Sequence, residues 1–170
     1  MVSDEPEKEK RIQEMKTTLI LVGKTADKHF QAGINDYAER ISHYMPFEIV
    51  TIPELRNTKN LSEEQQKTAE GELIMRQLQT SDTVVLLDEH GKVMTSVQYA
   101  KWLQQRTMNS RRLVFVIGGP YGFSPAVYSR ADEKISLSLM TFSHQRVRLI
   151  FTEQLYRACT IIKGEPYHHE

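Results

Sequence analysis

The sequence predicts one α/β domain with a mainly parallel sheet of five to six strands and helices on both faces. Helical patterns alternate with short apolar runs rich in β-forming residues, an order typical of parallel sheets covered by helices. The five runs lie at residues 18–22, 47–52, 83–87, 113–117 and 135–140. The length of 170 residues fits a single compact domain, which we place at residues 15–170.

Four segments carry apolar side chains at the spacing of an amphipathic helix. They lie at residues 26–44, 62–78, 96–106 and 147–162. Ser62 is a suitable N-cap for the second segment, and Thr95 or Ser96 for the third. A shorter helix is expected to begin near Ser124 and Pro125, after the fourth strand.

The first 14 residues form a leader that is dominated by charge. Val2 and Ile12 are its only strong apolar groups, so it buries little surface, and we expect it to be disordered or a frayed helix. Met15 immediately precedes the first convincing strand. We therefore predict that Met15, rather than Met1, is the functional start and that the leader is dispensable.

Composition and charge exclude several classes of protein. The 22 Lys and Arg residues offset the 22 Asp and Glu residues, which removes the pervasive positive field of a protein that coats nucleic acid, so any RNA contact is local. The single cysteine, Cys159, excludes an internal disulfide and a cysteine-based zinc cluster, which suits a reducing cytoplasm. A membrane span and a signal peptide are not expected, because the apolar runs are short and the leader is charged.

The most informative segment runs from Leu113 to Pro125. Its apolar strand stops at Gly118 and Gly119, and the chain turns through Pro120. Ligands of open α/β sheets bind beyond the carboxyl ends of strands, and adjacent glycines let a planar ligand approach the backbone. The pattern matches neither the dinucleotide fingerprint nor the P-loop. The turn is a candidate cofactor site, although an ordinary strand-to-helix turn is the more frequent meaning of so short a motif.

The following segment alternates serines with apolar residues. In a strand this pattern places Ser136 and Ser138 on one face, which indicates close approach of another backbone or a ligand, or else an exposed edge strand. For His144 alone, a helix-capping or core role is more common than catalysis. Polar and basic side chains gather at the expected carboxyl end of the strand: Thr141, Ser143, His144, Arg146 and Arg148.

The chain ends in a segment rich in aromatic and imidazole groups. Tyr167, His168 and His169 follow the last helical pattern. Adjacent side chains at a free terminus seldom define a closed metal site, so no metal is expected. Tails normally fray, and a function for this one depends on whether it folds back over the sheet.

Four motifs occur in order along the second half of the chain. They are IGGPYG at 117–122, SLSLMTFSHQRVR at 136–148, EQLYRA at 153–158 and PYHHE at 166–170. Together they resemble the ribosomal RNA large subunit methyltransferase H family of the SPOUT class. The resemblance extends from about Met15 to the C-terminus, and four motifs with this order and spacing are specific.

The resemblance implies an S-adenosylmethionine-dependent enzyme that methylates N3 of a pseudouridine in large-subunit (23S) ribosomal RNA, acting on assembled ribosomes in the cytoplasm. It also implies a C-terminal trefoil knot, an exception to the rule against threaded chains. Backbone groups are expected to hold the adenine while apolar walls enclose it. The cofactor-binding residues that the resemblance implies are Leu87, Gly119, Ser138, Leu139, Met140, Thr141, Phe142 and Ser143.

The same family implies a homodimer whose active site is completed across the subunit interface. In that arrangement the tail lies by the cofactor, which makes Tyr167 and His168 candidates for positioning the target base. The partners implied are a second copy of the chain, the ribosome and its large-subunit RNA. Neither DNA nor a membrane is expected as a partner.

Methyl transfer to N3 requires alignment of the methyl group and loss of the imide proton. We hypothesise that Glu153 or His168 assists proton loss, because both lie in motifs shared with the family; His144 is a third candidate base. Arg148 and Arg157 are candidates to stabilise the anionic base or to hold phosphate.

Three other functions stay open at this stage. The chain can be a SPOUT methyltransferase with a tRNA or a different ribosomal target. It can also be a non-catalytic ribosome-binding factor that keeps the fold and lacks the cofactor. A nucleotide-binding oxidoreductase is disfavoured, because the glycine fingerprint and its acidic partner are missing.

Overall fold

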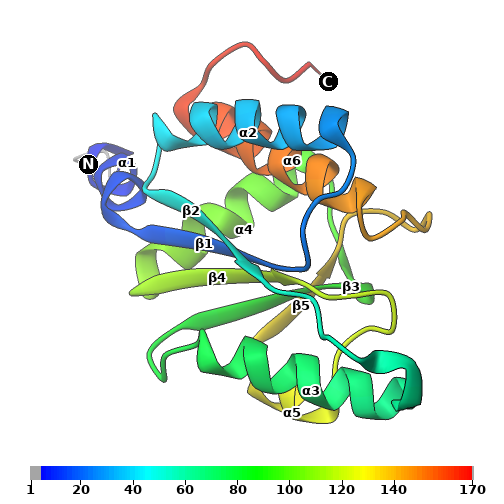
Figure 1. Ribbon diagram of the computed structural model, residues 1–170. Helices are drawn as coiled ribbons and strands as arrows, with labels where there is room; N and C mark the ends of the chain where they lie inside the picture. The colour runs from blue at the N-terminus through cyan, green and yellow to red at the C-terminus, as the bar shows by residue number, and fades with distance from the viewer. Residues whose placement is uncertain (1–4, 170) are drawn as a thin grey trace.

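The computed structural model describes residues 5–169; residues 1–4 and Glu170 lie outside the described part. Five parallel strands form a central sheet in the order β2-β1-β4-β3-β5 (Figure 1). The elements are α1 (Glu5–Glu14), β1 (Lys16–Val22), α2 (Lys28–Ser42), β2 (Phe47–Ile52), η1 (Thr58–Asn60), α3 (Glu63–Arg76), β3 (Thr83–Val93), α4 (Ser96–Asn109), β4 (Arg112–Ile117), α5 (Pro125–Arg130), β5 (Glu133–Ser136) and α6 (Arg146–Lys163).

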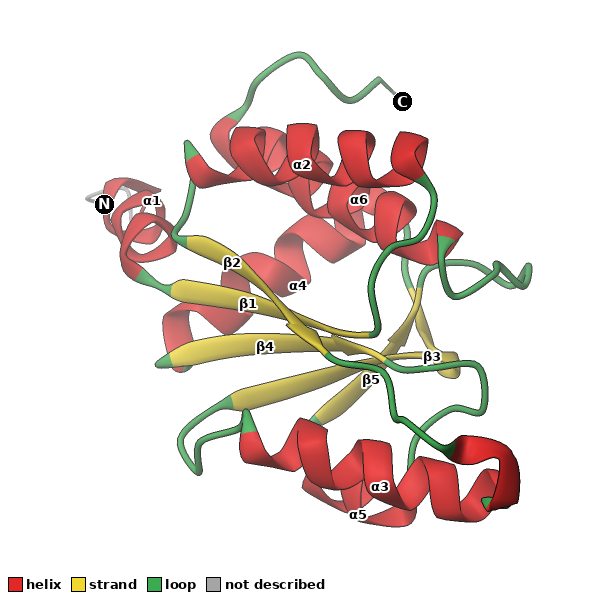
Figure 2. Ribbon diagram, in the orientation of Figure 1, coloured by secondary structure: helices red, strands yellow, loops and turns green. Residues whose placement is uncertain are grey.

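Helices cover both faces of the sheet (Figure 2). α2, α4 and α6 pack on one face, where the ring centroids of Phe115 in β4 and Phe151 in α6 lie 4.9 Å apart. α3 and α5 pack on the other face through a second apolar cluster that includes Ile74 and Val127. Strands buried on both faces need continuous apolar runs, which β1 and β4 have. The predicted parallel α/β sheet with two helix layers is confirmed.

Reciprocal capping boxes fix the starts of two helices. The Ser62 hydroxyl accepts a hydrogen bond from the backbone N–H of Gln65 at 3.1 Å, and the Gln65 side chain accepts from the Ser62 N–H at 2.9 Å. Thr95 and Gln98 make the same pair of bonds at the start of α4. Ser124 caps α5. The predicted cap at Ser62 and the predicted helix start near Ser124 are thereby confirmed, and of the two candidate caps for α4, Thr95 and Ser96, the structure uses Thr95.

The fifth strand is shorter than the sequence predicts. β5 ends at Ser136, whereas the alternating pattern predicts a strand to Met140. The Ser136 hydroxyl donates to the backbone carbonyl of Ser138 at 2.8 Å, and the Ser138 hydroxyl accepts from the Met140 N–H at 3.0 Å. Local bonds between hydroxyl and backbone compete with strand pairing, so the chain leaves the sheet here as a loop.

The third strand is longer than predicted and irregular in its second half. It continues beyond Leu87 to Val93, and its register with β5 shifts between Leu87 and Lys92. A Cβ atom on Gly91 would lie 2.5 Å from the backbone of Ile135, so the two chain segments approach too closely for a side chain at this point.

The described part of the leader is a helix. α1 packs against α4, and the side chain of Ile12 is only 5% exposed. Arg11 Nη1 donates a hydrogen bond of 3.1 Å to the backbone carbonyl of Met108. Of the two expectations for the leader, disorder or a helix, the structure shows a helix for residues 5–14, while residues 1–4 lie outside the described part. The assignment of Met15 as the functional start stays a prediction.

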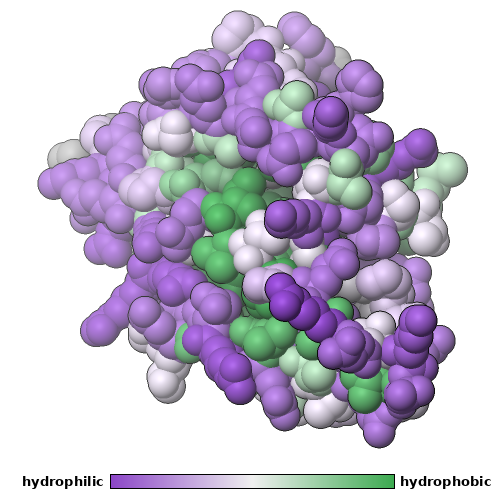
Figure 3. Space-filling model, viewed as in Figure 1, coloured by the Kyte–Doolittle hydropathy of each residue, from purple (hydrophilic) through white to green (hydrophobic). Residues whose placement is uncertain are grey.

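β2 forms one edge of the sheet and exposes apolar surface. Its residues Phe47, Ile49 and Val50 are half-buried. Figure 3 shows a hydrophobic band across the middle of this face, between the two helix layers. Among the helices of residues 5–169, none has the length and apolar character that a membrane span requires.

Candidate cofactor cleft

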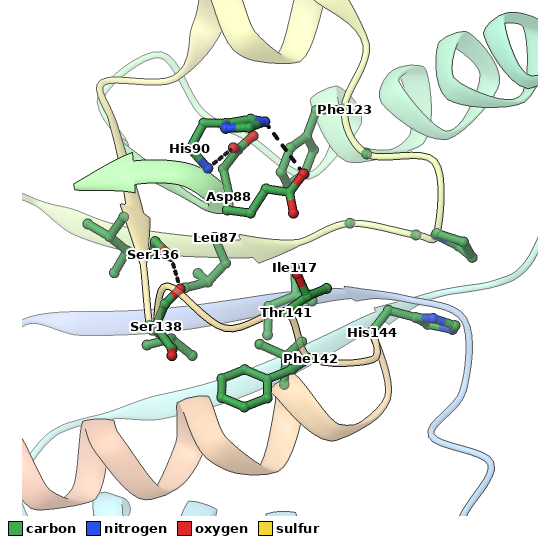
Figure 4. Close-up of a pocket in the computed structure, with 18 of the residues that line it drawn as sticks. Leu87, Asp88, His90, Ile117, Phe123, Ser136, Ser138, Thr141, Phe142 and His144 are labelled. Carbon is green, nitrogen blue, oxygen red and sulfur yellow. Dashed lines mark hydrogen bonds and ion pairs between the residues drawn. The ribbon is translucent and has the colours of Figure 1, made fainter. Parts of the chain in front are cut away.

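A cleft of about 520 Å³ opens at the carboxyl ends of β3 and β4 (Figure 4). Three segments form its walls: the end of β3 after Leu87, the glycine turn (residues 118–122) after Ile117, and the serine loop (residues 137–145) between β5 and α6. The carboxyl edge of an open parallel sheet is where ligands of this architecture bind. The structure thus brings together the glycine and serine segments that the sequence singled out.

Side chains at the first two positions of the glycine turn would press on neighbouring side chains. A Cβ atom on Gly118 would lie 3.0 Å from the ring of Phe123, and one on Gly119 would lie 2.8 Å from Glu70 Oε1. Gly122 has a φ of +81°, a region that favours glycine, and its N–H donates to the Gly119 carbonyl at 3.2 Å. The backbone of the turn is therefore bare toward the cleft.

The carboxyl group of Glu70 in α3 lies against this turn. Burial raises the pKa of Glu70; the Gly119 N–H partly offsets the rise, and the nearby carboxylate of Glu54 adds to it. The half-buried carboxylate of Glu70 contacts the backbone of Gly119. It packs the glycine turn against α3.

The serine loop is fixed where it meets α6. The Ser143 hydroxyl accepts a hydrogen bond from the Arg146 N–H at 3.2 Å. The Gln145 side chain accepts from the Ala26 N–H at 2.9 Å and donates to the Lys24 carbonyl at 3.3 Å. These bonds tie the end of the loop to the segment between β1 and α2, so the loop has a defined position beside the sheet.

The wall formed by the second half of β3 carries Asp88 and His90, which the sequence did not single out. Asp88 Oδ1 accepts a hydrogen bond from the His90 N–H at 2.8 Å, and the Tyr128 hydroxyl donates to the other carboxylate oxygen. Burial, followed by this hydrogen bond, raises the pKa of Tyr128 to about 12. The available signal was the polar run DEHG directly after an apolar strand, the same cue that marks the other two walls.

Comparison with known proteins identifies the family of the chain. Residues 15–168 match the family described as "Predicted SPOUT methyltransferase". The chain belongs to the SPOUT methyltransferases. Curated proteins named ribosomal RNA large subunit methyltransferase H, from Bacteroides fragilis and Phocaeicola vulgatus, are each 61% identical to it, over 157 and 158 residues respectively. Both alignments cover 92% of this chain and 100% of the relative. A protein of the same name from Porphyromonas gingivalis is 53% identical over 157 residues.

Membership in the SPOUT family implies the C-terminal trefoil knot that the motifs led us to expect. The three walls of the cleft come from the C-terminal half of the chain. The close passage of Gly91 in β3 by the backbone of Ile135 in β5 lies in the same half.

Six of the eight cofactor-binding residues expected for this SPOUT chain line the cleft. They are Leu87, Gly119, Ser138, Met140, Thr141 and Phe142. Two do not line it: Leu139, which is 88% exposed, and Ser143, whose hydroxyl accepts a hydrogen bond from the first N–H of α6. His144 does line the cleft. Binding of a cofactor by these residues stays a prediction. Within residues 5–169, no three His, Cys, Asp or Glu side chains are arranged to hold a metal ion.

Three of the four predicted catalytic residues form a separate group on α6 and the tail. Arg157 Nη2 donates to Glu153 Oε1 at 2.5 Å, and the Tyr167 hydroxyl donates to the same oxygen at 3.2 Å. Arg157 Nη1 lies 3.1 Å from His168 Nδ1. None of these four side chains lines the cleft of its own chain. We call them the tail cluster.

Aromatic side chains hold the tail on the helices. The ring centroids of Tyr156 in α6 and Tyr167 lie 4.7 Å apart, and Tyr37 of α2 lies 5.9 Å from Tyr156. The Tyr44 hydroxyl donates to the Glu165 carboxylate. Figure 1 shows the tail running back along α2 and α6, on the side of these helices that faces away from the sheet. The tail therefore folds back over the helices rather than over the sheet.

Arg148, the fourth predicted catalytic residue, is fully buried elsewhere in α6. Its Nη2 donates to the Val22 carbonyl at 2.7 Å, and its Nη1 donates to the Gly23 carbonyl at 2.9 Å and to Thr25 Oγ1 at 3.0 Å. A buried guanidinium engaged in this way reaches neither a substrate base nor a phosphate. In this arrangement Arg148 secures α6 to the end of β1.

Proposed function

We propose that this chain transfers a methyl group from S-adenosylmethionine to N3 of a pseudouridine in large-subunit ribosomal RNA. The observation that carries the proposal is the cleft, which the glycine turn and the serine loop form together at the carboxyl edge of a SPOUT sheet. The names of the relatives supply the class of substrate. We further propose that the protein acts in the cytoplasm on the assembled ribosome.

The side chains of the cleft fit the chemistry of this donor. Leu87, Ile117 and Phe142 offer apolar walls to a flat purine, and the absence of side chains at Gly118 and Gly119 lets its edge approach the backbone of the glycine turn. The carboxylate of Asp88 places negative charge beside a donor that carries a positive sulfonium. The volume of about 520 Å³ lies within the usual range for small-molecule sites.

The bound donor supplies an electrophilic methyl group, so the chain needs no metal to activate it. The residues around the cleft have two tasks: to exclude water and to hold N3 in line with the methyl group, with the reacting atoms roughly 3 Å apart. The proton of N3 must leave before or during transfer. Of the cleft residues, His144 is the titratable side chain on the serine-loop wall.

We propose that a second copy of the chain completes the active site. The tail cluster carries Glu153, Tyr167 and His168, yet it lies outside the cleft of its own chain. Leu139 and Met140 are 88% and 76% exposed on the serine loop, which leaves apolar surface for a partner to cover. In such a dimer the target base lies between the cleft of one copy and the tail cluster of the other.

The substrate is tested by mass mapping of large-subunit RNA from cells that lack the gene. We expect the loss of one methyl group on one pseudouridine, restored by the wild-type gene, and methylation in vitro of purified ribosomes in preference to tRNA. Methylation of tRNA instead identifies another SPOUT target. Calorimetry with S-adenosylmethionine separates the enzyme from a non-catalytic factor, which gives no binding heat.

A double variant tests the tail cluster separately from the cleft. Glu153→Gln with His168→Ala is expected to abolish methylation while S-adenosylmethionine binds as in the wild type, because neither residue lines the cleft. Glu39→Gln with His43→Ala makes the same chemical changes at exposed positions near the end of α2 and is the matched control. Full activity of the first double variant would remove the tail cluster from the proposal.

A further inference from the structure

The contact between Arg157 and His168 fixes which imidazole nitrogen carries the proton. Arg157 Nη1 lies 3.1 Å from His168 Nδ1, within hydrogen-bond distance. A guanidinium is always protonated in proteins and has donors only, so Nδ1 must accept this hydrogen bond. An imidazole whose Nδ1 accepts is neutral and carries its one proton on Nε2.

The guanidinium of Arg157 is held on several sides. Glu153 Oε1 accepts from its Nη2 at 2.5 Å, and the side chains of the pair are only 23% and 19% exposed. The ring of Tyr167 lies 4.8 Å from the guanidinium carbon, close enough for a cation–π contact. The hydrogen bond with Glu153 also raises the pKa of Arg157, which keeps the positive charge in place.

The carboxylate of Glu153 is occupied as well. It accepts hydrogen bonds from Arg157, from the Tyr167 hydroxyl at 3.2 Å and from the Gln154 side chain at 3.0 Å. These three hydrogen bonds engage both carboxylate oxygens of Glu153 within the tail cluster. In this arrangement neither Glu153 nor Nδ1 of His168 is free to take a proton from a substrate.

We infer that Arg157 is a positioning residue, held by Glu153, that keeps His168 neutral with its Nε2–H free to donate a hydrogen bond to the target base. The role toward the base rests on the function proposed above. N3 of a uracil ring is flanked by two carbonyl groups, and their oxygens gain negative charge when N3 loses its proton. A fixed N–H donor beside such an oxygen stabilises the anion that accepts the methyl group. His168 then acts as a donor rather than as a base.

The tautomer is measured directly by long-range 1H–15N spectra of the full chain labelled in its histidines. The sequence has 6 histidines, and the His168→Gln variant assigns the signal. We expect His168 to show a single tautomer with the proton on Nε2, whereas exposed His169 averages between both forms. The tautomers of His168 are expected to interconvert in Arg157→Met. The same is expected in Arg157→Lys, because lysine lacks the planar guanidinium. A proton on Nδ1, or averaging in the wild type, would overturn the inference.

Activity on ribosomes tests the role of the donor. Glutamine places an amide N–H near the position of Nε2, so His168→Gln should stay within about tenfold of the wild-type kcat, while His168→Ala should lose about 100-fold. Arg157→Met should lower kcat with S-adenosylmethionine binding unchanged, and the exposed Arg76→Met is the control. Equal losses in His168→Gln and His168→Ala would contradict the donor role.

Absence of methylation by the wild type would refute the proposed function. It would not affect the result of the tautomer measurement.

Discussion

The guanidinium of Arg148 in α6 donates a hydrogen bond of 2.9 Å to the backbone carbonyl of Gly23, directly after β1. The Val22 carbonyl accepts a second bond from the same side chain. The serine loop ends where α6 begins, so this contact also fixes one end of the loop relative to the sheet. The fully buried Arg148 side chain thereby helps to position the serine loop, which is one wall of the cleft.

Replacement of Arg148 by methionine is expected to lower the free energy of unfolding by roughly 2–4 kcal/mol, because two buried carbonyls lose their donor. Burial lowers the pKa of Arg148, which shows that burying its charge costs free energy. Methionine removes this cost, and so the loss of stability is smaller than the lost hydrogen bonds alone would give. Urea denaturation followed by circular dichroism measures the change. Arg146→Met, two residues away and exposed, should change stability by less than about 1 kcal/mol. Equal midpoints for both variants would contradict a structural role.

The sheet was predictable because its strands are buried on both faces. Such strands need unbroken apolar runs, as in β1, β4 and the first half of β3. The capping boxes at Ser62 and Thr95 were visible for a similar reason, since both partners lie within four residues. Contacts between residues close in sequence determine the caps, and an apolar run marks each buried strand, so both can be predicted from the sequence.

The rest depends on contacts that a local pattern does not contain. Ser138 follows a strand-like alternation, but its hydroxyl binds the backbone two residues on and the sheet ends. Arg148 looks like any cation after a polar loop, and its partners lie more than 120 residues away. Within one chain Glu153 and His168 lie outside the cleft, so a role for them beside the cofactor depends on the second copy of the chain that the motifs predict.

Substitution of Gly119 by alanine is expected to weaken the binding of S-adenosylmethionine about tenfold. The added methyl group would lie 2.8 Å from Glu70 Oε1, so the Glu70 side chain must move away and give up its hydrogen bond with the Gly119 backbone, which loosens this wall of the cleft. Isothermal calorimetry measures the affinity. Gly33→Ala is the control, because its methyl group likewise meets the movable end of a side chain, that of Leu149, and neither of these two residues lines the cleft. Unchanged affinity in Gly119→Ala would exclude the glycine turn as a wall of the donor site.

Acid is expected to remove the stabilisation that Glu133 provides. A hydrogen bond from Arg106 holds the pKa of Glu133 below its ordinary value of 4.5, and Trp102 Nε1 adds a second bond at 3.1 Å. Because the pKa is lower in the folded state, the stabilisation is complete above pH 4.5 and is lost as the pH falls through the folded pKa. Glu133→Gln should therefore be less stable than the wild type by about 1 kcal/mol at pH 7, with the difference shrinking below about pH 4.

Unfolding by urea at several pH values from 7 to 3 measures this dependence. Glu72→Gln changes an exposed carboxylate of α3 and should match the wild type throughout. A difference between Glu133→Gln and the wild type that is the same at pH 3 and pH 7 would mean that the ion pair with Arg106 does not cause it.

Deletion of residues 1–14 is expected to lower stability without affecting the cleft. The deletion uncovers Met15, now 4% exposed, and removes Ile12, whose burial contributes about 2 kcal/mol. α1 lies where β1 begins, at the opposite edge of the sheet from the carboxyl ends that form the cleft (Figure 1). The shortened chain should therefore unfold at lower urea and bind S-adenosylmethionine with unchanged affinity. Ile12→Ala in the full chain should reproduce most of the loss, because the other residues from 6 to 14 are mostly charged and exposed. Weaker donor binding by the shortened chain would mean that the leader reaches the cleft and that Met15 is not a sufficient start.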